Sequence, residues 1–267
     1  MGPESEAESV IRSYMATAES YLAQLNIYPR DLLRYPFDSI ALEMTSKAFS
    51  ICDACLLLLR EGHQEEAYGL SRSLTECALI LPYLTKDSND RASESAAFVR
   101  YSLAEKNLWL YHARKNLSGT QNLVEVERLA KEWKLTGDPQ TARRGWSSKF
   151  KTYKAQQLTH PLDGLSSNDA IKAAAYALDY TQTSQFVHCS QPGLDNFYPD
   201  QGVPFRVKKS RSEYWDVTQR TPYLLLEYLH SVIQYSLFGM GQASPQTLLD
   251  HFSECLEALS PVSAKKR

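Results

Sequence analysis

The chain has 267 residues, of which 43% are hydrophobic, so it can bury the core of one large helical domain or of two small ones. Its formal net charge is only −2, which excludes a global field that would draw the whole molecule to nucleic acid or to an anionic membrane. No run of about 18 apolar residues is present, and the chain starts with acidic and polar residues, so we expect no membrane association and a cytoplasmic location.

The first half of the chain has apolar side chains at a spacing near 3.6 residues, which indicates amphipathic helices. We predict helices over residues 5–27, 37–59, 64–84, 89–117 and 122–135. Residues 74–84 are apolar nearly all round, which is typical of a buried helix. Pro82 is expected to kink or end the third helix, because proline has no amide hydrogen to donate.

The second half predicts further helices over residues 169–188, 223–238 and 244–259. The second of these is apolar on most sides, so we expect it to be central. Residues 191–211 are rich in proline and glycine and form the longest irregular stretch. The sequence therefore predicts an all-α fold: a single-domain helical bundle of about eight helices over residues 1–260, with one long irregular loop near 190–211 and a disordered tail at 261–267.

The chain has five cysteines, an odd number with no spacing typical of a disulfide framework. We expect them to be reduced and mostly buried. Neither the cysteines nor the histidines form paired ligand spacings, and no glycine-rich phosphate loop is present. We therefore expect no metal and no cofactor.

Arg72 and Glu76 are charged residues within the most apolar part of the third helix, one turn apart. Burying a lone charge costs several kcal/mol, roughly, so we expect the two to pair with each other or with groups from another helix. The pair has three interpretations: it holds helices in register, it contacts a ligand or substrate, or it is an exposed ion pair that contributes little.

Tyr176, Tyr180, Ser184 and His188 follow one another at intervals of four, which places them on one ridge of the predicted helix 169–188. The helix is expected to end just after His188, where the carbonyl-rich C-terminus favours a protonated imidazole. His188 is then either a structural histidine or a group that transfers protons or contacts phosphate. A Ser184–His188 nucleophile is disfavoured, because no nucleophile elbow accompanies it.

Trp146, Ser147 and Lys149 follow two arginines, a basic and aromatic combination typical of contacts with phosphate or a nucleobase. A second basic cluster lies on the long loop at residues 208–211. Exposed basic residues on loops are also common in proteins that bind no nucleic acid. Each cluster alone is therefore weak evidence.

Three motifs carry a resemblance to a known family: Arg72-x-x-x-Glu76, Trp146-Ser-Ser-Lys149, and the row that ends at His188. Together they resemble DUF5677, a bacterial helical family of unknown function, over roughly residues 40–240. The resemblance implies an all-α fold and little established biochemistry. More distantly, the chain is similar to the HEPN class of metal-independent ribonucleases, which place an arginine and a polar residue four to six positions before their histidine.

In this chain Gln182, Thr183 and Ser184 occupy that window, so Arg72 or Lys149 would have to supply the cation through space. Two hypotheses follow for a pocket that joins Arg72, Glu76, Lys149, Tyr180, Ser184 and His188. The first is a binding or interaction module in bacterial stress or phage defence, which takes a small anionic ligand or a partner.

The second hypothesis is a HEPN-like endoribonuclease, in which His188 acts as general acid and base on a ribose hydroxyl while a cation stabilises the phosphorane. Its catalytic candidates are His188, Arg72 and Glu76. RNA would be the substrate and a homodimer is expected, because such sites usually form across a symmetric interface. In either case the binding residues are expected to be Trp146, Ser147, Lys149, Tyr180 and Ser184.

Overall fold

The computed structural model describes residues 3–25, 35–85, 89–132 and 215–260. These ranges are all-α, as predicted, and contain no strand. Their helices are α1 (Pro3–Gln24), α2 (Pro36–Arg60), α3 (Gln64–Thr85), α4 (Arg91–Asn116), α5 (Gln121–Glu132), α8 (Trp215–Gly239) and α9 (Gln246–Leu259).

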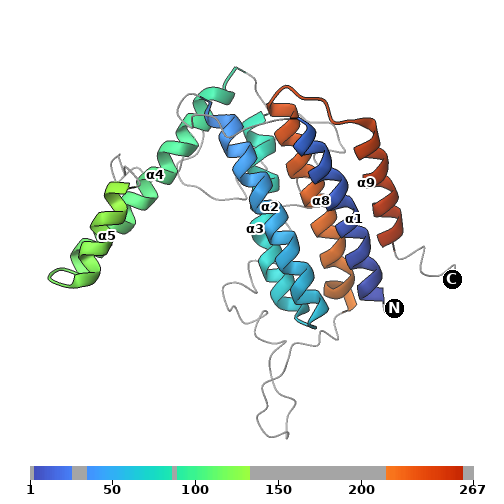
Figure 1. Cartoon of the computed structure of the whole chain (residues 1–267), viewed down its shortest axis with the longest axis horizontal. Helices are drawn as coiled ribbons and strands as arrows, with labels where there is room; N and C mark the ends of the chain where they lie inside the picture. The colour runs from blue at the N-terminus through green and yellow to red at the C-terminus, as the bar shows by residue number, and fades with distance from the viewer. Residues whose placement is uncertain (1–2, 26–34, 86–88, 133–214, 261–267) are drawn as a thin grey trace, which may run out of the picture.

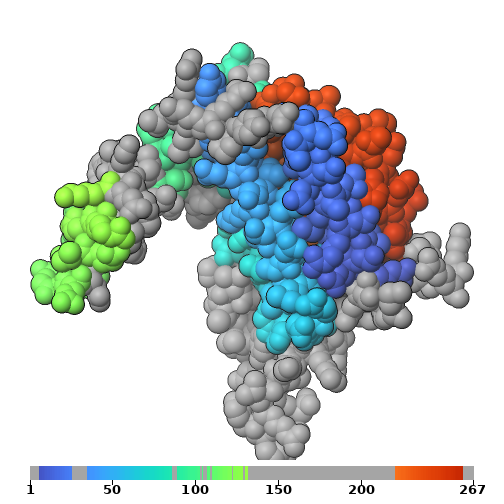
Figure 2. Space-filling model, viewed as in Figure 1, coloured from blue at the N-terminus to red at the C-terminus, as the bar shows by residue number. Residues whose placement is uncertain are grey.

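Helices α1, α2, α3, α8 and α9 lie side by side in a bundle, while α4 and α5 form an arm that leaves one end of it (Figure 1). The space-filling view shows α5 standing clear of the bundle (Figure 2). A small apolar cluster of Leu110, Ala113, Val126 and Ala130 holds α4 and α5 together. The outer part of the arm therefore packs separately from the main core, whereas the start of α4 joins that core through Val99.

Helix α8 is the centre of the bundle and packs against α1, α2, α3 and α9. Leu225, Leu229 and Ile233 are fully buried, and so is Tyr228 on another side of the helix. Each fully buried aliphatic side chain stabilises the fold by about 1.5–3 kcal/mol relative to an exposed one. The central position predicted for the apolar range 223–238 is confirmed.

Two buried polar residues of α8, His230 and Ser236, are hydrogen-bonded to helices distant in sequence. Tyr14 on α1 bonds through its hydroxyl to Nδ1 of His230 at 2.7 Å. The His230 ring stacks on Phe252 of α9, with centroids 3.8 Å apart and planes 9° apart. These contacts tie α1, α8 and α9 together, because a buried polar group that lost its partner would be costly.

Two helix boundaries differ from the sequence prediction at prolines. Helix α8 begins at Trp215 rather than Tyr223 and contains Pro222. The preceding residues are largely polar, so no apolar period marks them as helical. Helix α3 continues past Pro82 to Thr85, whose hydroxyl donates to the carbonyls of Leu81 and Pro82, at 3.0 Å each.

Gly239 at the end of α8 lies where the ends of α2, α3 and α4 meet. A Cβ at this position would lie 2.1 Å from Cζ of Phe37 and 2.8 Å from Cγ2 of Thr85. Arg91 of α4 places its guanidinium 5.5 Å from the centre of the Phe37 ring and donates to the Gly239 carbonyl. Only glycine leaves room for this ring against the backbone of α8.

Cys52, Cys55, Cys77 and Cys255 are free and buried, in agreement with the prediction of reduced thiols. Burial raises the pKa of Cys55 to about 12 and that of Cys77 to about 11. The thiolate is the reactive form, so these groups are inert at neutral pH.

Several predicted features lie outside the described residues: the helix 169–188, the loop near 190–211, the tail at 261–267 and Cys189. The assignment of residues 1–260 to one domain stays a prediction.

Candidate functional site

Helix α3 carries a row of polar side chains on one face. Glu65, Arg72, Glu76 and Tyr83 are separated by seven, four and seven residues, intervals close to whole numbers of helical turns. The row is opposite the stripe of Leu74, Ala78 and Leu81 that packs into the core. Helix α3 therefore carries an apolar stripe on one side and a row of polar side chains on the other, and Tyr83 of that row also joins the main core.

The charged face of α3, defined as Glu65, Arg72, Glu76 and Tyr83, is withdrawn from water. Glu65 is 2% exposed, and the side chains of Arg72 and Glu76 are 18% and 28% exposed. Tyr83 is buried as well. A face opposite the core is ordinarily solvated, so the low exposure distinguishes this one from a typical helix surface.

The Arg72–Glu76 pair predicted from the sequence is present, and its geometry is loose. One nitrogen of the Arg72 guanidinium lies 3.4 Å from Oε1 of Glu76. The more exposed pair of Arg12 and Asp53 is closer, at 2.9 Å. A buried pair that stabilises a fold is expected to be short and well hydrogen-bonded, because these bonds must offset the desolvation of both charges.

At the far end of the charged face, α3 contacts the start of α4. The Tyr83 hydroxyl donates to Oε2 of Glu94 at 3.3 Å, and Glu94 is buried. The face thus has one guanidinium, a phenol and three carboxylates in or beside it. Such a set can bind an anion at Arg72 and accept hydrogen bonds from hydroxyl or amino groups of the same ligand.

The structure brings Arg72 and Glu76 together and leaves the rest of the predicted site untested. His188, Tyr180, Ser184, Trp146, Ser147 and Lys149 lie outside the described residues. The predicted contact between the Arg72–Glu76 pair and His188 therefore stays a prediction, and so does the basic and aromatic contact surface.

Three residues of this region were missed in the sequence. Glu65 and Tyr83 could have been found by extending the Arg72–Glu76 row by two turns in each direction. Glu94 could not, because it lies on the next helix and its distance from Tyr83 depends on how α3 and α4 are placed relative to each other.

The described ranges contain no group of three or more His, Cys, Asp or Glu side chains arranged to hold a metal ion. Among the helices of the same ranges, none combines the length and apolar character needed to cross a bilayer.

The described helices define an all-α helical-bundle protein in which α3 carries a row of polar side chains. The chain matches the family of unknown function DUF5677 over residues 38–201, more than half of its 267 residues, and belongs to that family. The matched range includes the charged face of α3. Comparisons with curated proteins and with solved structures found no match.

Proposed function

We propose that this protein is a binding module that takes a small anionic ligand at the charged face of α3, with Arg72 as the group that contacts the anion. The observation that carries the proposal is the partial burial of Arg72 beside Glu76, with one guanidinium nitrogen 3.4 Å from Oε1 of that carboxylate. A phosphate or carboxylate that replaces Glu76 gains the shorter, two-pronged hydrogen bonds for which a guanidinium is suited.

The carboxylates around Arg72 define what else the ligand carries. A bare anion would be repelled by Glu76, whereas an anion with hydroxyl groups can donate hydrogen bonds to that carboxylate and to Glu65. A sugar phosphate has both features. The same chemistry occurs in RNA, so the charged face supports the ligand class without separating a free molecule from a nucleic acid.

The test uses ribose phosphate, inorganic phosphate and ribose as probes of the full chain. A ligand at ten times its Kd stabilises the native state by about 1.4 kcal/mol, which a melting-temperature shift reports. We expect ribose phosphate to give the largest shift and ribose the smallest. Arg72→Gln should abolish the shift, and Arg60→Gln, at an exposed arginine on α2, should preserve it.

Glu76→Gln provides a test of opposite sign. If Glu76 is the counter-ion that the ligand displaces, its neutralisation strengthens anion binding while Arg72→Gln weakens it. Equal responses of wild type, Arg72→Gln and Arg60→Gln would contradict the proposal, and so would a wild-type protein that none of the three probes stabilises.

The ribonuclease hypothesis is separated from simple binding by an assay on RNA. Purified protein is incubated with total RNA in EDTA, beside His188→Ala and Arg72→Ala. Cleavage by wild type that is lost in both variants would replace the binding module by a metal-independent nuclease. Intact RNA supports the module. A role in bacterial stress or phage defence, and a homodimer, stay predictions.

A further inference from the structure

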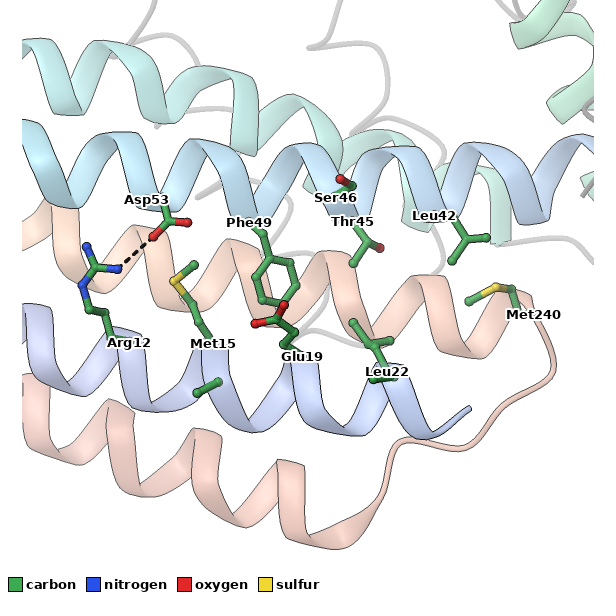
Figure 3. Close-up of a pocket in the computed structure, with 12 residues that line it drawn as sticks. Arg12, Met15, Glu19, Leu22, Leu42, Thr45, Ser46, Phe49, Asp53 and Met240 are labelled. Carbon is green, nitrogen blue, oxygen red and sulfur yellow. Dashed lines mark hydrogen bonds and ion pairs between the residues drawn. The ribbon is translucent and has the colours of Figure 1, made fainter. Parts of the chain in front are cut away.

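A groove of about 570 Å³ runs between α1 and α2 on the bundle (Figure 3), and no residue of the charged face of α3 lines it. Its volume is that of a typical small-molecule site. One wall is α1, which precedes the matched family range, and the other wall is α2. The groove therefore depends on a helix that the family match does not include.

The groove exists because α1 turns small residues towards α2. Ala16 and Ala23 line it from α1, while the neighbouring stripe of Ile11, Tyr14 and Ala18 is packed into the core. The space left open has an apolar lining of Met15, Leu22, Leu42, Phe49 and Met240. Thioether and aromatic side chains adapt readily to ligands of irregular shape.

Charge in the groove is unbalanced towards negative. Its charged lining residues are Arg12, Glu19 and Asp53. Arg12 already contacts two carboxylates, Glu8 at 2.8 Å and Asp53 at 2.9 Å. Within the described part of the chain Glu19 has no hydrogen bond or ion pair. An anion entering the groove would meet an engaged arginine and an uncompensated carboxylate.

The ring of Phe49 points from α2 towards the Glu19 carboxylate on α1 (Figure 3). A carboxylate beside an aromatic ring is a favourable environment for an ammonium group, which the carboxylate binds directly and the ring face attracts. The apolar residues on both sides of this point can cover a hydrocarbon body. The groove thus combines two features of a site for a hydrophobic amine.

We propose that the α1–α2 groove is a second binding site, which takes a small organic cation with an apolar body and a protonated amine. The ammonium group binds Glu19 and Phe49, and the apolar body lies along Leu22 and Leu42. This ligand class is opposite in charge to that of the charged face of α3, so the two sites can be tested independently.

Three probes of matched size separate the contributions: phenylbutylamine, phenylbutanol and phenylbutyrate, which are cationic, neutral and anionic at neutral pH. The full chain is labelled at its methionine methyl groups, and each probe is titrated by NMR. Met15 and Met240 line the groove, whereas Met44 on α2 does not. We expect saturable shifts of the Met15 and Met240 signals and a stationary Met44 signal.

The amine should bind more tightly than the alcohol by about three- to tenfold, the effect of one charge-assisted hydrogen bond at a partly exposed site. Phenylbutyrate should bind more weakly than either. Glu19→Gln should bring the amine to the affinity of the alcohol and leave the alcohol unchanged. Glu257→Gln, an exposed carboxylate on α9 with the same charge change, should have no effect. High salt should reduce only the amine preference.

Several results would overturn the proposal. They are a Kd for phenylbutyrate equal to that of the amine, shifts of Met44 as large as those of Met15, and an equal loss in Glu19→Gln and Glu257→Gln. Ala16→Trp gives a further check, because it fills the groove from an exposed helix position. All three probes should lose binding in this variant, and retained binding would place their site elsewhere.

Discussion

The Arg72–Glu76 pair allows the structural and functional interpretations of α3 to be separated by measurement. The perturbation is a double-mutant cycle of Arg72→Met, Glu76→Gln and the double variant. Arg72→Met keeps the hydrocarbon part of the side chain, and Glu76→Gln keeps its shape, so the cycle isolates the charge interaction. A pair that exists to hold the fold together should give a large coupling energy.

The geometry of the pair predicts a small coupling energy between Arg72 and Glu76. Two unit charges 3.4 Å apart attract by about 5 kcal/mol at an effective dielectric constant of about 20, before desolvation is counted. Desolvation of two partly buried ions offsets several kcal/mol of that attraction. The exposures of 18% and 28% leave both groups partly hydrated. We therefore expect a coupling of about 1 kcal/mol, and single variants that each lose no more than about 2 kcal/mol.

The assay is urea unfolding followed by far-UV circular dichroism, repeated at low and high salt. The exposed pair of Arg128 and Glu125 serves as the reference and should show a weaker coupling than Arg72 and Glu76. A coupling of about 3 kcal/mol or more, or outright unfolding of either single variant, would refute the reasoning. The pair would then have a structural role, and the main observation in favour of a binding site on the charged face of α3 would no longer support it.

Three further predictions concern the rest of the bundle. Tyr14→Phe removes a buried hydrogen bond and should lower the free energy of unfolding in urea by about 1–3 kcal/mol. Tyr21→Phe removes a hydrogen bond to an exposed carbonyl and should lower it by less than about 1 kcal/mol. Equal losses in the two variants would contradict this prediction. Gly239→Ala should lower the free energy of unfolding by about 3 kcal/mol or more, because the new Cβ overlaps the Phe37 ring. If this overlap is the cause, adding Phe37→Ala to the same variant should recover part of the loss. The pKa of the Cys77 thiol is about 11 in the native state and about 9 in the unfolded chain. Between these pH values the native state binds more protons than the unfolded state, so the free energy of unfolding falls as pH rises. Relative to Cys77→Ala, the wild type should lose about 3 kcal/mol across that range, and a flat difference would show that the thiol pKa is ordinary.

Most of the helical bundle could be predicted because its signals are local. The apolar run that includes Leu225 and Ile233 identifies a central helix without any knowledge of its neighbours. The spacing of Arg72 and Glu76 likewise predicts that they meet, because residues four apart touch on any helix. The beginning of α8 at Trp215 was missed, since a polar helical segment has no apolar period to detect.

The two proposed sites differ in how many of their residues can be predicted from the sequence. Once Arg72 is singled out, helical spacing predicts the other three residues of the charged face of α3, which are Glu65, Glu76 and Tyr83. Glu94 lies on α4, so its contact with Tyr83 cannot be predicted from spacing along one helix. The groove has no sequence signal of its own. The groove depends on the distance between α1 and α2. A role for Ala16 and Glu19 can be inferred only from the structure, which places Phe49 of α2 in the same groove.

The matched family range contains only part of the core on which its own helices depend. Helices α2 and α3 pack against α8, which begins after residue 201, and the apolar stripe of α3 at Leu74 and Ala78 belongs to the same cluster as Leu225 and Leu229. Without α8 that stripe would face water, at a cost of about 25 cal/mol for each Å² exposed. The position of the charged face of α3 therefore depends on α8, which lies outside the matched range, as well as on α2, and a variant that displaces α8 should disturb the proposed anion site as much as a change in α3.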